Sequence, residues 1–187
     1  MESTARQARD EWIARRCQLG EPEAFADLVR ELERPLLYFA QKLLGNEDSA
    51  LDVLQEVWLN AFQTIRRLDN PRVLRPWLYR MTRGLAIDRI RKDQSDERLQ
   101  RVYAEQAASA AEEPAFDEED AAAVHQALDT LDVKHREVLV LCFLEDMTIA
   151  EIASIVGCPE GTVKSRIHHA KRALKAALQG TSHERRA

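Results

Sequence analysis

The chain has 187 residues, of which 27 are basic and 32 acidic, and its formal net charge at pH 7 is -5. Hydrophobic residues make up 45%, which is ordinary for a globular protein and excludes a collagen-like or wholly disordered chain. Leu, Ala, Arg and Glu dominate, and these residues lose little side-chain freedom in a helix. No run of about 18 apolar residues and no signal-peptide core occur, so we expect a cytoplasmic protein.

Neither a metal site nor a disulfide framework is predicted. The three cysteines, Cys17, Cys142 and Cys158, form no C-x-x-C pair, which fits a reducing compartment. The five histidines do not join them at zinc-ligand spacing, and we expect no cofactor of any kind. Phosphate-binding, zinc-protease and nucleophile-elbow motifs do not occur either, so the sequence does not point to an enzyme or to a small-molecule substrate.

Charge is distributed unevenly along the chain. Residues 66–92 hold nine basic and two acidic side chains, and residues 164–187 hold seven basic and one acidic. Between them, residues 93–120 hold ten acidic and two basic side chains. The two basic segments are either ordinary solvated helix faces or two surfaces that bind a polyanion, and on charge alone both interpretations stand.

Hydrophobic periodicity predicts three helices in the first half of the chain. They cover Glu23–Leu44, Asp48–Arg67 and a segment from Pro76 to Lys92. Pro35 predicts a kink or a boundary in the first helix, because proline lacks a backbone N–H. The apolar stripe expected for the second helix comprises Leu51, Leu54, Trp58, Phe62 and Ile65.

The acidic stretch after the third helix has few large apolar groups, so we expect at most transient helix there. The predicted fold is all-α, with two small helical domains joined by a flexible acidic linker. The predicted divisions are an N-terminal extension 1–19, a first domain 20–93, a linker 94–120, a second domain 121–180 and a tail 181–187.

The most specific local pattern lies in the second domain. Thr148 and Glu151 have the spacing of a capping box, Gly157 suits a tight turn, and Pro159 suits the first turn of the next helix. The next helix is expected to bury Val163, Ile167, Ala170 and Leu174. Its outward face then carries Lys164, Ser165, His168, His169 and Arg172. Two helices around a compact turn, the second of them basic, predict a helix-turn-helix that binds DNA rather than a plain helical hairpin.

These residues resemble the extracytoplasmic-function (ECF, group IV) sigma factors of bacterial RNA polymerase. The segment GCPEGTVKSR at 157–166 is similar to sigma region 4.2, and 131–148 to region 4.1. In the first domain, 52–59 resembles region 2.2, and 75–80 with 86–91 resembles regions 2.3 and 2.4. The resemblance extends over residues 20–178. Two unrelated blocks in the right order make it far more specific than a lone helix-turn-helix.

The resemblance implies a specificity subunit that binds core polymerase, recognises -35 and -10 promoter elements and assists strand opening. Its partners would be the β′ clamp and β flap of polymerase, promoter DNA, and an anti-sigma factor that is often membrane-anchored and holds the protein at the inner membrane. The loop 68–74 would capture a base flipped from the -10 element.

The residue roles implied by the resemblance fall into three sets. Core polymerase would be bound by Asp52, Gln55 and Glu56. The -10 element would be contacted by Arg67, Asn70, Arg72, Arg75, Trp77, Tyr79, Arg80 and Arg83, although the helical spacing of Trp77 favours a place in the core over stacking on a base. The -35 element would be contacted by Lys164, Ser165, Arg166, His168, His169 and Arg172.

One departure from the family and one rival interpretation bear on these expectations. Many family members carry Asn where this chain has Gly84, so a polar contact to the -10 element is missing there. The rival is a conventional helix-turn-helix regulator that binds duplex DNA without polymerase.

Overall fold

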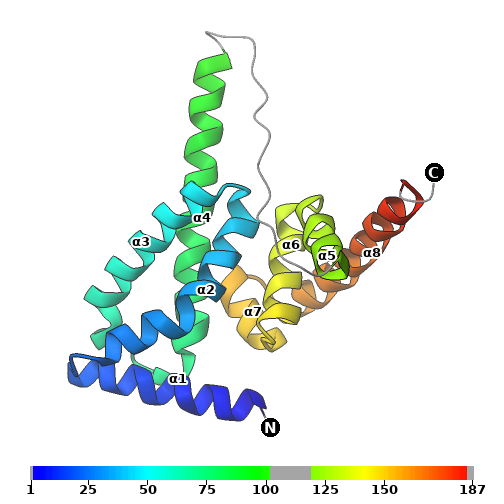
Figure 1. The fold of residues 1–187 in the computed structure, drawn as a ribbon. Helices are drawn as coiled ribbons and strands as arrows, with labels where there is room; N and C mark the ends of the chain where they lie inside the picture. The colour runs from blue at the N-terminus through cyan, green and yellow to red at the C-terminus, as the bar shows by residue number, and fades with distance from the viewer. Residues whose placement is uncertain (1, 102–118, 185–187) are drawn as a thin grey trace.

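The structure is a computed structural model that describes residues 2–101 and 119–184 (Figure 1). The first unit is built from α1 (Glu2–Leu19), α2 (Ala24–Leu44), α3 (Glu47–Thr64), two 3-10 turns, η1 (Ile65–Arg67) and η2 (Pro71–Val73), and α4 (Leu74–Arg101). The second comprises α5 (Glu119–Asp129), α6 (Val133–Leu139), the π-helical turn η3 (Val140–Leu144), α7 (Ile149–Val156) and α8 (Glu160–Glu184). Within these ranges all regular structure is helical, which confirms the all-α prediction.

Helix α2 forms the centre of the first unit. Its buried side chains recur every three or four residues and are at most 3% exposed: Leu28, Leu32, Leu36, Phe39 and Leu43. The helix runs through Pro35 without ending, so the boundary considered there does not occur. It stops at Gly45, which has a φ of 68°, and the Asn46 side chain then caps α3 by accepting a hydrogen bond from the amide of Ser49.

The stripe expected for the second helix is partly wrong. Leu54 and Ile65 are buried, but Leu51 is 46% and Phe62 66% exposed. The buried face instead consists of smaller residues: Ala50, Val53, Leu54, Val57 and Ala61. Small side chains let α3 lie close to both α2 and α4, which it contacts. The predicted stripe gave most weight to large apolar side chains, so it lies on a face of α3 that is rotated away from the buried face.

The predicted N-terminal extension is a helix that packs on the first unit. Ile13 and Ala14 of α1 are 1% and 0% exposed and join its core. Helix α1 also contacts η1, η2 and the start of α4. It therefore lies beside the segment that connects α3 to α4.

Helix α4 extends into the predicted linker. It continues to Arg101, so the expectation of at most transient helix is wrong for residues 94–101. An ion pair one turn apart, Arg89 to Asp93 at 3.4 Å, supports the helix where the acidic stretch begins. The middle of the predicted linker, 102–118, lies outside the described residues, as does part of the tail, 185–187.

The helix-turn-helix forms as the sequence predicts. The capping box between Thr148 and Glu151 is complete, and Gly157 ends α7 in the left-handed conformation with a φ of 69°. In α8, Val163 and Ala170 are fully buried. Pro159 lies just before α8 rather than within it, and its carbonyl accepts hydrogen bonds from the amides of Thr162 and Val163.

The two units pack against each other. Helix α7 lies on α4 and α6 lies on α2, and buried residues from both units form one hydrophobic cluster. Polar contacts cross the same interface: Lys42 forms an ion pair with Asp129 at 2.7 Å, and Arg136 donates to the carbonyl of Lys42 at 2.6 Å. None of the described helices is long and apolar enough to cross a membrane.

Candidate polymerase and nucleic-acid interface

The three side chains expected to bind polymerase are exposed together on α3. Asp52, Gln55 and Glu56 lie on the face opposite the core, and the contact recorded for Asp52 is an ion pair with Arg89 at 3.7 Å. Leu59, one further turn along, is 59% exposed. Sequence reasoning missed Leu59, although its spacing of seven from Asp52 places it on the same face. The arrangement is an acidic and amide surface with an apolar side chain at its end, which suits docking to another protein.

The connection from α3 to α4 holds the loop 68–74. The Asn70 side chain accepts a hydrogen bond from the amide of Arg72 at 3.1 Å and begins η2, with Pro71 at its first position. Arg67, just before this turn, and Arg72, inside it, are both exposed. Arg72 also pairs with Glu11 of α1, at 2.9 Å between Nε and Oε2. Two of the expected DNA-contacting arginines therefore lie at a turn with defined backbone geometry.

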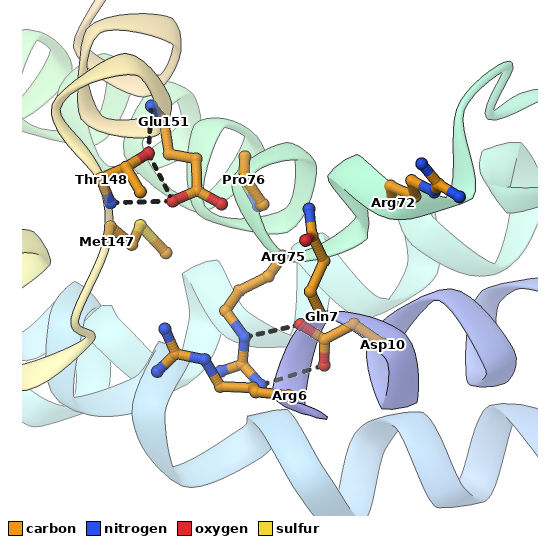
Figure 2. Close-up of a pocket in the computed structure, with 9 residues that line it drawn as sticks. All are labelled: Arg6, Gln7, Asp10, Arg72, Arg75, Pro76, Met147, Thr148 and Glu151. Atoms are coloured by element: carbon orange, nitrogen blue, oxygen red, sulfur yellow. Dashed lines mark hydrogen bonds and ion pairs between the residues drawn. The ribbon is translucent and has the colours of Figure 1, made fainter. Parts of the chain in front are cut away.

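Arg75, at the start of α4, is not available to DNA as it lies here. Its guanidinium donates to both carboxylate oxygens of Asp10, at 2.9 and 3.1 Å, and Glu145 of the second unit is 3.8 Å away. Burial opposes the charge of Arg75, but the hydrogen bonds and charge of Asp10 outweigh it and leave the pKa raised. The pair lines a cavity of about 220 Å³ together with Arg6 of α1 and the Thr148–Glu151 capping box. Figure 2 shows how these side chains lie around it.

The aromatic residues of α4 belong to the core rather than to a stacking surface. Tyr79 is 0% exposed, its ring lies 5.2 Å from that of Phe39, and burial raises the pKa of its hydroxyl well above the usual value. The expectation that Tyr79 stacks on a base is wrong for this arrangement, because no face of the ring is open. Trp77 is half-buried against the same core, as its spacing also allowed. Arg80, by contrast, is exposed.

One buried carboxylate joins the two predicted DNA-binding sets. Glu137 of α6 is 1% exposed and accepts from Nε of Arg83 at 2.7 Å, while Arg166 of α8 lies 3.6 Å away. Arg83 was expected at the -10 element and Arg166 at the -35 element. Sequence reasoning missed Glu137, although an acidic residue directly before the apolar run 138–144 was a signal that it needs partners.

The remaining -35 set is open to solvent. Lys164, Ser165, His168, His169 and Arg172 are all exposed along α8, which confirms the outward face expected for this helix. Near its middle, Lys171 lies over the ring of Phe143, 4.6 Å from the ring centre. No cluster of metal-ligating side chains occurs among the described residues. The face therefore offers hydrogen-bond donors and acceptors to a ligand.

The cysteines are unpaired. Cys17 is buried, and this burial raises the pKa of its thiol to about 11. Because the thiolate is the reactive form of cysteine, this raised pKa lowers the reactivity of Cys17 near neutral pH. Cys142 and Cys158 are partly buried, and burial also raises the pKa of Cys142.

Comparison with known protein families covers both units. Residues 28–95 match Sigma-70 region 2, and residues 121–174 match Sigma-70, region 4. The ECF RNA polymerase sigma factor SigW of Bacillus subtilis is 32% identical over 171 residues, which is 86% of this chain and 91% of the relative. The chain belongs to the ECF sigma factors of the sigma-70 family. SigL of Mycobacterium tuberculosis, another ECF sigma factor, is 35% identical over 170 residues, covering 86% of this chain and 94% of that one.

Solved sigma-factor structures share the fold. CnrH in complex with the cytosolic domain of CnrY matches with a TM-score of 0.67 and 26% identity, over 91% of this chain and 97% of that one. RpoE of Bartonella quintana, in complex with the anti-sigma factor NepR, matches with a TM-score of 0.69 and 25% identity, over 84% and 98%. This ECF sigma factor therefore has both regions of its family in one chain.

Proposed function

We propose that this ECF sigma factor binds core RNA polymerase and directs initiation at promoters whose -35 element is contacted by α8 and whose -10 element is contacted by the loop 68–74 with the exposed arginines near it. The observation that carries the proposal is the continuous polar and basic face of α8 on an intact helix-turn-helix, in one chain with region 2. The protein contributes recognition, and polymerase carries out the chemistry.

At the -35 element, α8 would lie in the major groove. Lys164 can donate to guanine O6 and N7, and Ser165, His168 and His169 can donate to or accept from base edges. Arg172 is placed for phosphate contact, with Arg166 joining it once released from Glu137. Each phosphate neutralised contributes about -0.9 to the slope of log affinity against log salt, so binding should weaken steeply as salt rises.

At the -10 element, the loop 68–74 would receive a base extruded from the non-template strand. Unstacking costs a few kcal/mol, so contacts to the flipped base must offset part of that cost. Asn70 shapes the turn, and Arg67, Arg72 and Arg80 are exposed for phosphates around it. Arg75 and Arg83 join this set only where their ion pairs are broken.

The exposed face of α3, formed by Asp52, Gln55, Glu56 and Leu59, would dock on the β′ clamp of polymerase. It combines negative charge with an apolar contact, which gives both orientation and burial at a protein interface. The second unit would contact the β flap. Tethering both units on polymerase raises their effective concentration at a promoter, so two weak contacts select one correctly spaced site.

Promoter binding through both sets requires the two units to separate. Glu137 occupies Arg83 and approaches Arg166, and Glu145 approaches Arg75, so these carboxylates lie where phosphates would bind. The cytoplasmic domain of an anti-sigma factor, itself anchored at the inner membrane, would control this separation of the two units. The complexes of CnrH with CnrY and of RpoE with NepR support such a partner.

Permanganate footprinting tests the proposal directly. Promoter fragments selected from the source genome are incubated with bacterial core polymerase, with and without the protein, and reactive thymines are mapped. The proposal predicts reactive -10 thymines only when both components are present. Protection of duplex DNA by the protein alone, with nothing added by polymerase, would instead establish a conventional helix-turn-helix regulator.

A further inference from the structure

Helix α1 makes polar contacts to both ends of the loop 68–74. Gln18 reaches the N-terminal end of the loop, Glu11 reaches Arg72 inside it, and Asp10 reaches Arg75 just beyond it. These three side chains come from one helix, yet their partners lie about 50 to 65 residues away in sequence. No residue of α1 was assigned a role from the sequence.

Gln18 contacts the loop where it begins. Its side-chain amide donates to the carbonyl of Leu68 at 2.7 Å and lies 3.5 Å from that of Ile65. Leu68 is the C-cap of η1, where helical hydrogen bonding stops and backbone acceptors need other partners, whereas Ile65 is the first residue of η1. The Leu68 amide itself bonds back to Ile65 at 3.1 Å. Gln18 therefore fixes the direction in which the chain leaves η1.

Glu11 and Asp10 hold the far end of the loop. Glu11 accepts from Arg15 of its own helix and from Arg72, and these two hydrogen bonds lower the pKa of its carboxyl group. Asp10 is 4% exposed and pairs with Arg75 through two hydrogen bonds. The Asp10–Arg75 pair anchors the start of α4, and the more exposed Glu11–Arg72 pair limits the directions open to Arg72.

We propose that α1 is a positioning element for base capture, in which Gln18, with Glu11, holds the loop 68–74 in the geometry that receives the flipped base. The inference rests on the proposed function of that loop. A loop fixed before binding pays less ordering entropy when the base enters than one that must order at that moment. The contribution of Gln18 therefore belongs to strand opening, rather than to polymerase binding or -35 recognition.

An isosteric substitution separates this role from packing. Gln18→Glu keeps the size of the side chain but removes its donors and places a carboxylate against two carbonyls. The matched control is Gln94→Glu, which makes the same change at an exposed position far along α4 from the loop. Gln18→Lys restores a donor and serves as the rescue variant.

The measurement uses holoenzyme and a promoter fragment that the wild-type holoenzyme opens, with 2-aminopurine at the -10 position that becomes unstacked. Closed-complex affinity and opening rate are determined separately. Gln18→Glu should lower the opening rate about tenfold, as expected for loss of a partly buried hydrogen bond. Closed-complex affinity should stay at the Gln94→Glu value, and Gln18→Lys should open within about twofold of wild type.

Equal opening rates for Gln18→Glu and Gln94→Glu would overturn the inference, while opening by wild type would leave the proposed function standing. A fall in closed-complex affinity that matches the fall in opening rate would also overturn it, because α1 would then act on the fold as a whole. If Gln18→Glu does not fold, the comparison of Gln18→Lys with Gln18→Ala decides, since only the former can donate. If wild-type holoenzyme opens no selected promoter, the proposed function fails, and the inference fails with it.

Discussion

The two surfaces proposed to bind DNA differ in how much of their charge is free. On α8, Lys164, His168 and Arg172 face solvent. On α4, Arg75 and Arg83 instead form ion pairs, and part of that pairing comes from the second unit. A surface for duplex recognition is thus open, whereas the surface for opened DNA is partly covered. Under the proposed function, acidic side chains of the second unit would compete with phosphates for these arginines of the first unit.

The free energy needed to uncover Arg75 and Arg83 must come from new contacts made by these arginines. Breaking a buried carboxylate–arginine ion pair leaves both charges without a partner, which costs free energy. The separation of the units is therefore favourable only if another anion binds the arginine. Promoter phosphates and a polymerase surface can supply that anion together.

Removing the carboxylate of Asp10, which holds Arg75 at the start of α4, should lower the stability of the protein more than the other substitutions do. Asp10→Ala leaves the guanidinium of Arg75 buried with only Glu145 nearby, and it should lower the free energy of unfolding by about 3–5 kcal/mol. Chemical denaturation followed by circular dichroism measures it. The exposed Asp88→Ala serves as the control, and an equal loss in both variants would contradict the buried pair.

Removing the carboxylate charge that pairs with Arg83 should let the proposed -10 surface bind DNA more tightly. Glu137→Gln keeps the shape of the side chain but removes the charge shared by Arg83 and Arg166, so phosphates no longer compete with it. Binding of the isolated protein to a single-stranded oligonucleotide should tighten about tenfold, the size of one hydrogen bond to a charged group. Fluorescence anisotropy measures it, with the exposed Glu160→Gln as the control. Unchanged affinity would contradict the competition between Glu137 and phosphate.

On the open side, Arg172→Ala tests phosphate contact by α8. The slope of log affinity against log salt for a -35 duplex should become shallower by about 0.9, because one phosphate contact is lost. Sequence preference should stay the same, since phosphate contacts carry no base information. Arg34→Ala, at an exposed position on α2, should leave the slope unchanged. An equal slope in both variants would show that Arg172 makes no phosphate contact.

The smallest expected effect concerns Gly84. It is exposed on α4, and an added Cβ would meet nothing within 4 Å. Gly84→Ala should therefore raise the free energy of unfolding by up to about 1 kcal/mol, the difference in helix propensity. Gly84→Asn places a polar side chain beside Arg80 and Arg83, and the effect of both variants on -10 opening can be compared by permanganate reactivity. Destabilisation by Gly84→Ala would show that the site is not open space.

The features predicted well from sequence are those set by near neighbours. The capping box at Thr148, the turn at Gly157 and the outward face of α8 depend on residues within a few positions of one another. The true face of α3 was missed because Ala50 and Ala61, which allow close helix packing, carry little hydrophobic signal. Tyr79 was misplaced since its burial depends on Phe39, forty residues away.

The contacts between the units could not be predicted from local patterns. Glu137 meets Arg83 across 54 positions, and Asp10 meets Arg75 across 65. Charge counts identified basic segments correctly, but they could not show which charges are neutralised by partners distant in sequence. The same limit hid the contact of Gln18 with the loop 68–74.

The most direct test of this account measures the distance between the two units. Spin labels are placed at two exposed positions, Asp88→Cys on α4 and Lys175→Cys on α8, after Cys142 and Cys158 are replaced by serine. We expect a single narrow distance distribution for the isolated protein and a clear shift to longer distances when core polymerase is added. A distribution that is the same with and without polymerase would contradict the claim that the second unit covers the -10 surface until the holoenzyme forms.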